Sequence, residues 1–80
     1  MDYITLYTSE GSLNMPQEQK QPFREWAYSE LSSAYPDFNI FVLKEPSTRL
    51  FDYKSEEGKI KKDSLSDFIS QMFERWKRMQ

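Results

Sequence analysis

The sequence predicts an α+β fold with the element order β-α-β-β-α, in which two helices pack on one face of a small, antiparallel or mixed three-stranded sheet. Two segments, 23–35 and 65–76, repeat apolar residues at spacings of three and four, as amphipathic helices do. Three short runs rich in β-branched and aromatic residues, 3–8, 38–43 and 48–53, have strand length. The 80 residues contain no repeat, low-complexity tract or linker, so a single domain over 1–80 is expected.

The first strand is predicted at residues 3–8, YITLYT, because β-branched and aromatic side chains suit a pleated, half-buried surface. Alternation along this strand puts Ile4 and Leu6 on one face. Residues 10–12, Glu-Gly-Ser, have turn chemistry and are expected to end the strand.

The first helix has a clear apolar stripe but an ambiguous beginning. Asn14 followed by Pro16 has the form of a helix entry, with Asn14 as the cap. Pro22 lacks a backbone donor, so the helix either kinks there or begins at Pro22. The helix is expected to end at Tyr35, before Pro36. Its predicted stripe is Phe23, Ala27, Leu31 and Ala34, flanked by Trp26 and Tyr35, with Arg24, Glu25, Ser29 and Ser32 mostly off it.

The two apolar runs after this helix are expected to pair as an antiparallel hairpin, joined by the loop at 44–47. Residues 55–62 are harder to assign. Glu57-Gly58 is either a turn that returns a short strand through Ile60 or part of a loop, and a loop is favoured.

The second helix carries the strongest pattern in the chain. Ser64 and Asp67 have the spacing of a capping box, which would begin the helix at Ser64. The helix ends in a basic cluster, Arg75, Lys77 and Arg78, that suits the negative end of the helix dipole. Six apolar residues share one face that should pack on the sheet: Leu65, Phe68, Ile69, Met72, Phe73 and Trp76.

Composition excludes several kinds of chemistry. Without cysteine or histidine there is no disulfide framework, no thiolate metal site and no imidazole base. No serine has an evident basic partner, and the acid pairs Glu56/Glu57 and Asp63/Asp67 lack the spacing of a calcium loop. We therefore expect a protein that is not an enzyme and that uses no cofactor or metal. No apolar run reaches ~20 residues and no leader pattern is present, so a cytoplasmic protein without a membrane contact is expected.

Two features favour a macromolecular partner. The chain has two Trp, five Tyr and six Phe, more rings than a core of this size is expected to cover, and surplus rings are typical of protein-binding surfaces. Core packing of the same rings remains the alternative. The rings in question are Phe38, Phe41, Phe51, Tyr53, Trp26, Tyr28 and Tyr35.

A basic stretch gives the second feature. Lysines interleaved with Tyr53 and Ile60 are a pattern that contacts nucleic-acid phosphates, although two glutamates in the same stretch oppose the field and a solvated loop is the alternative. These lysines are Lys54, Lys59, Lys61 and Lys62.

The chain resembles the DinI-like family, small bacterial and prophage proteins that act on the RecA recombinase filament. The residues that carry the resemblance are Thr8-Ser9 after the first strand, Pro16 before the first helix, Ala34-Tyr35-Pro36-Asp37 after it, the hairpin that follows, and Trp76 late in the last helix. The resemblance implies that the last helix presents acidic residues to the recombinase and partly imitates single-stranded DNA. The matching partner-binding residues here are Asp63, Asp67 and Glu74, with Ser70 and Gln71 between them on the polar face.

Three hypotheses of function follow. The first is a non-enzymatic modulator of a recombinase filament, in the response to DNA damage, that docks its C-terminal helix. The second is a bacteriophage or mobile-element inhibitor that binds another host enzyme through the surplus rings and the acidic first half of the chain. The third, less favoured, is a nucleic-acid-binding module that uses the lysines of residues 54–62.

Overall fold

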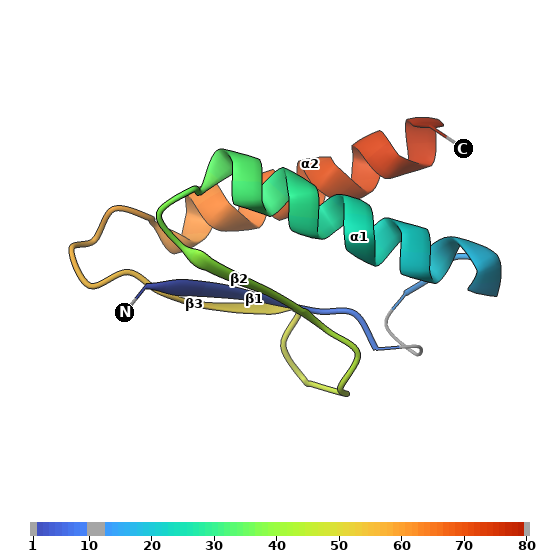
Figure 1. Ribbon diagram of the computed structural model, residues 1–80, viewed down its shortest axis with the longest axis horizontal. Coiled ribbons are helices and arrows are strands. Elements are labelled where there is room, and N and C mark those ends of the chain that lie inside the picture. Colours follow the sequence, from blue (N-terminus) through green and yellow to red (C-terminus); the bar gives the residue numbers. More distant parts are fainter. Residues whose placement is uncertain (1, 10–12, 80) are drawn as a thin grey trace.

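The computed structural model describes residues 2–9 and 13–79 and has the predicted β-α-β-β-α order. Both helices lie on one face of a three-stranded sheet (Figure 1), so the predicted α+β fold is confirmed. The turn expected at 10–12 lies outside the described residues. The elements are β1 (Tyr3–Tyr7), α1 (Gln17–Ala34), β2 (Asn39–Leu43), β3 (Phe51–Lys54) and α2 (Lys62–Met79).

The strand order is β2-β1-β3, with β1 parallel to β2 and antiparallel to β3. The expected hairpin between the second and third strands is therefore wrong, because β1 lies between them. β1 takes the centre, where its Ile4 and Leu6 are both fully buried. The seven residues 44–50 that join β2 to β3 are longer than the two to five of a typical hairpin loop, and they cross the end of β1.

The core lies between the sheet and the two helices. All six apolar residues predicted for the last helix belong to the core or pack against it, which confirms that face. Ala34 was expected on the buried stripe of α1 but is exposed, because it lies at the last position of the helix. The fully buried side chains are Ile4, Leu6, Phe23, Ala27, Leu31, Leu65, Ile69 and Met72.

The beginning of α1 differs from the prediction. The helix begins at Gln17 and passes through Pro22, so it does not begin at Pro22. Pro16 occupies the N-cap position, no side chain caps the helix, and the expected role of Asn14 as cap is wrong. Proline is tolerated here because an extended φ and ψ at Pro16, −57° and 148°, direct the chain into the first turn.

The beginning of α2 also differs. The helix begins at Lys62, so Ser64 is its third residue and the expected capping box is wrong. The first turn closes through the Leu65 N–H, which donates to the Lys61 carbonyl at 3.1 Å. Residues 55–61 form a loop, as favoured, with Gly58 at φ +65° in a turn closed by its N–H and the Ser55 carbonyl at 3.1 Å.

A buried arginine joins α1 to the ends of β1 and β2. Arg24 was expected mostly off the apolar stripe, but it is only 6% exposed. Its Nε donates to Thr8 Oγ1 at 2.9 Å and its Nη2 donates to the Thr8 carbonyl at 2.8 Å. The same hydroxyl donates to the Leu43 carbonyl at 2.8 Å. Burial is possible because these bonds offset part of the cost of removing the guanidinium from water.

Candidate protein-binding surface

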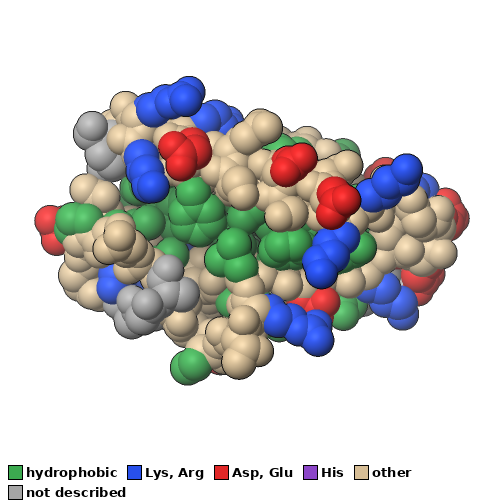
Figure 2. Space-filling view, turned by 180° about the vertical axis from the view of Figure 1, so that it is seen from behind, with side chains coloured by type: hydrophobic (Ala, Val, Ile, Leu, Met, Phe, Trp, Pro, Cys, Tyr) green, Lys and Arg blue, Asp and Glu red, His purple; other side chains and the backbone are tan. Residues whose placement is uncertain are grey.

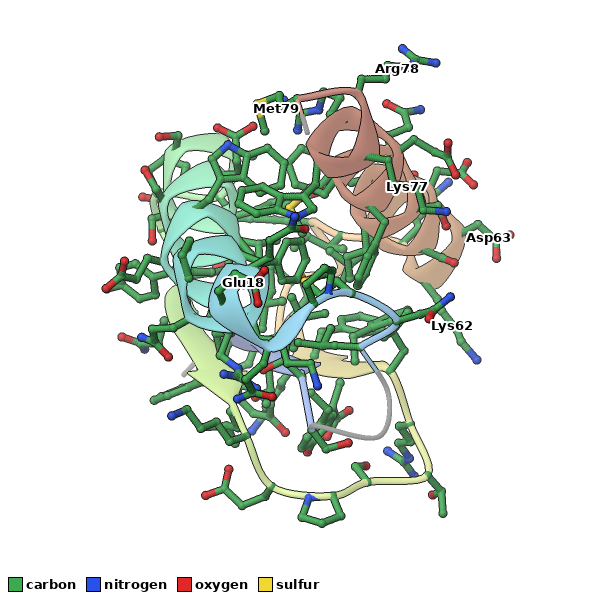
Figure 3. All side chains as sticks on the ribbon, turned by 90° about the vertical axis from the view of Figure 1, so that its right-hand side faces the viewer. Glu18, Lys62, Asp63, Lys77, Arg78 and Met79 are labelled. Atoms are coloured by element: carbon green, nitrogen blue, oxygen red, sulfur yellow. The ribbon has the colours of Figure 1, made fainter. Side chains whose placement is uncertain are left out.

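The polar face of α2 carries the five residues predicted to bind a partner, and all five are exposed. Their spacings of four, three, one and three place them along one side of the helix, over about 16 Å at 1.5 Å per residue. Asp63 points away from α1 and into solvent (Figure 3). We define this α2 polar face as Asp63, Asp67, Ser70, Gln71 and Glu74.

The opposite side of α2 fixes the orientation of this face. Leu65, Ile69 and Met72 are fully buried, which prevents the helix from rotating about its axis. The last turns are held by a cluster of rings from both helices. In this cluster the ring centroids of Phe23 and Phe73 lie 5.0 Å apart, those of Phe23 and Trp76 5.4 Å, and those of Trp26 and Trp76 5.5 Å.

The carboxylates of the α2 polar face are little compensated. Asp63 and Asp67 form no ion pair with another described residue, while Glu74 lies 3.8 Å from Lys77 Nζ. Asp63 is in the first turn, where the helix dipole stabilises a negative charge. On the side of the molecule opposite to Figure 1, charged groups of both signs lie along the upper border, above a band of hydrophobic side chains (Figure 2).

The basic end of α2 is partly turned inward. Arg75 forms an ion pair with Glu30 of α1, and its guanidinium lies over the Trp26 ring, 5.4 Å from the centroid. Lys77 pairs with Glu74, whereas Arg78 points outward and has no ion pair among the described residues (Figure 3). The outward positive charge is therefore smaller than the sequence, with three basic residues at 75, 77 and 78, indicates.

The lysines of the alternative nucleic-acid surface are also compensated in part. Lys54 Nζ lies 3.5 Å from Glu56 and Lys59 Nζ lies 3.4 Å from Glu57. Lys61 and Lys62 have no ion pair with a described residue, but Lys62 is followed by Asp63 at the start of α2. Two local acids thus reduce the field that phosphate binding requires.

Only two of the seven rings expected in excess of the core are well exposed in the structure. Of the seven rings singled out in the sequence, Tyr28 is 52% exposed and Phe41 is 47% exposed, and the other five pack against the core. Tyr28 lines a groove of about 450 Å³ between α1 and β2, whereas alternation along β2 directs the Phe41 ring to the opposite face of the sheet. The sequence did not indicate this groove, because it depends on the placement of α1 over an edge strand.

Other kinds of site find little support in the part of the chain that is described. Residues 2–9 and 13–79 contain no cluster of three potential metal ligands, and neither helix is long and apolar enough to cross a membrane. Comparisons with protein-family models, with curated proteins and with solved structures give no match.

Proposed function

We propose that this protein is a non-enzymatic, cytoplasmic modulator that docks the α2 polar face on a basic surface of a partner protein. The observation that carries the proposal is the pair of exposed carboxylates, Asp63 and Asp67, that have no ion pair among the described residues. Charges left uncompensated on a rigid helix attract a complementary surface and set the orientation in which it binds.

The partner proposed first is a RecA-type recombinase filament. A surface that holds single-stranded DNA must be basic, because most of the affinity for nucleic acid comes from phosphate contacts. An exposed row of carboxylates offers the same sign of charge in an extended arrangement, which agrees with the resemblance to the DinI-like family. The inward position of Arg75 lowers the positive charge that would oppose such docking.

The test is a charge reversal on the face. The double variant Asp67→Lys/Glu74→Lys changes two exposed positions. The matched control, Glu45→Lys/Glu57→Lys, makes the same change of charge at two exposed loop positions that are not part of the face. We expect co-sedimentation with a recombinase filament on single-stranded DNA, and the effect on its ATPase, to be lost only in the first variant.

Two further measurements, the dependence of binding on ionic strength and affinity capture of the partner, complete the test. Binding of the unchanged protein should weaken as ionic strength rises, because exposed charges are screened. If both double variants bind the filament as the unchanged protein does, the proposed role of the α2 polar face is wrong. Recovery of a different host enzyme by affinity capture, with the same loss in the first variant, would retain the binding face and replace the recombinase as its partner.

A further inference from the structure

The sheet has two edge strands, β2 and β3, and the edge at β3 is protected against pairing with another chain. The Tyr53 N–H donates to the Asp52 carboxylate at 2.9 Å. Arg49 lies 3.6 Å from the same carboxylate, and Lys54 ends the strand. Side-chain capping, charges and short length are the devices by which proteins prevent an edge strand from pairing with another chain.

The β2 edge lacks the charged side chains and the side-chain capping of the β3 edge. Its five residues, Asn39–Leu43, contain no charged side chain and no proline. Asn39 donates its N–H to the Asp2 carbonyl at 3.1 Å, and the Leu43 carbonyl accepts from the Thr8 N–H at 2.7 Å, so both residues direct their backbone groups toward β1. Because a strand alternates, Ile40 and Val42 direct their N–H and C=O groups to the open edge.

The side chains near this edge are apolar and exposed. Phe41 is 47% exposed on the face of the sheet that the helices do not cover. On the other face, Tyr28 and the half-buried Ile40 and Val42 line the groove between α1 and β2. An added strand would satisfy the backbone groups and cover both apolar surfaces.

We infer that this strand is β2 of a second copy, paired antiparallel about a two-fold axis at Phe41. In this register Ile40 exchanges two backbone hydrogen bonds with Val42 of the second copy, and Val42 does the same with its Ile40. Four bonds then satisfy every outward group of both strands. The two Phe41 rings meet as a non-hydrogen-bonded pair, the arrangement in which opposite side chains lie closest.

The neighbouring two-fold registers fit less well. An axis at Ile40 would pair Val42 with Phe38, whose N–H already donates to the Tyr35 carbonyl at 3.1 Å. An axis at Val42 would pair Ile40 with Lys44, which lies beyond the end of β2. The Phe41 register alone uses only the available groups, and it keeps the helices of both copies on the same face of a six-stranded sheet.

The first experiment measures the dimer by sedimentation equilibrium over a wide range of protein concentration. Phe41→Lys places two positive charges against each other at the axis and should raise the dimer Kd by at least about tenfold. Leu50→Lys is the matched control, since Leu50 is 43% exposed but lies outside β2. A protein that stays monomeric at all concentrations, or a dimer that both variants leave unchanged, overturns the inference.

The second experiment tests the register. The chain has no cysteine, so Phe41→Cys introduces a single thiol whose Cα should lie ~4.5 Å from its copy, within disulfide range. Asn39→Cys is the control on the same face of the strand. It would lie more than ~13 Å from its copy, given about 3.4 Å per residue. Phe41→Cys should form disulfide-linked dimers on oxidation, and equal cross-linking of both variants refutes the register. The result does not depend on the α2 polar face.

Discussion

Replacing Arg24 with methionine would test the buried contact that joins α1 to the ends of β1 and β2. The guanidinium makes two hydrogen bonds to Thr8, at 2.9 and 2.8 Å, and hydrogen bonds to charged groups contribute about 1.5–3 kcal/mol each. Methionine keeps much of the apolar stem, and it also removes the cost of burying a charge. We therefore expect the free energy of unfolding to fall by about 3 kcal/mol, less than the two bonds would give together.

The assay is urea unfolding followed by circular dichroism and by tryptophan fluorescence. Arg78→Met is the matched control, since Arg78 is exposed and has no ion pair among the described residues. Thr8→Val removes the hydroxyl that accepts from Arg24 and donates to Leu43. Because the two side chains share one bond, the double variant should lose about 1 kcal/mol less than the sum of the single variants. A loss in Arg24→Met no larger than in Arg78→Met would refute the structural role of this contact.

Two further predictions concern α1 and its C-terminal end. Pro22 is exposed inside the helix, so Pro22→Ala should stabilise the protein by about 1–3 kcal/mol in urea unfolding, and a lower stability would contradict this account. Burial raises the pKa of the Tyr35 phenol, so the unfolded chain releases this proton first as the pH rises. The contribution of Tyr35 to the free energy of unfolding should therefore be fully present below pH ~10 and be lost as the pH rises above it. The decline in the urea midpoint should be smaller in Tyr35→Phe, and an identical decline would exclude Tyr35 as its source.

The sequence predicted the elements better than their pairing. The helical period from Leu65 to Trp76 is long enough to define both the helix and its buried face, so that prediction was confirmed. The hairpin was wrong because two strands that follow one another in the chain do not reveal that β1 lies between them. The helix beginnings were wrong for a local reason. Asn14 and Ser64 have capping chemistry, but α1 begins at Gln17 without a side-chain cap and α2 begins at Lys62, so capping chemistry alone did not locate either beginning.

The candidate surface was likewise predicted only in part. Exposure of the α2 polar face follows directly from the spacing of its residues, as periodicity predicted. The pairing of Arg75 with Glu30 joins two helices 45 positions apart, and no local pattern indicates it. The buried state of Arg24 was missed for a similar reason, since its acceptors come from the end of β1.

The two proposed surfaces lie on different sides of the molecule, and their separation has a consequence for binding. α1 packs on β2, while α2 lies behind α1 and away from the β2 edge (Figure 1). A dimer formed through β2 therefore leaves the α2 polar face of each copy accessible. Two such faces on one rigid sheet can engage two subunits of a repeating partner at once, and the second contact is then made at high effective concentration. Individually weak, salt-screened contacts would gain affinity in this way from a filament and not from an isolated subunit.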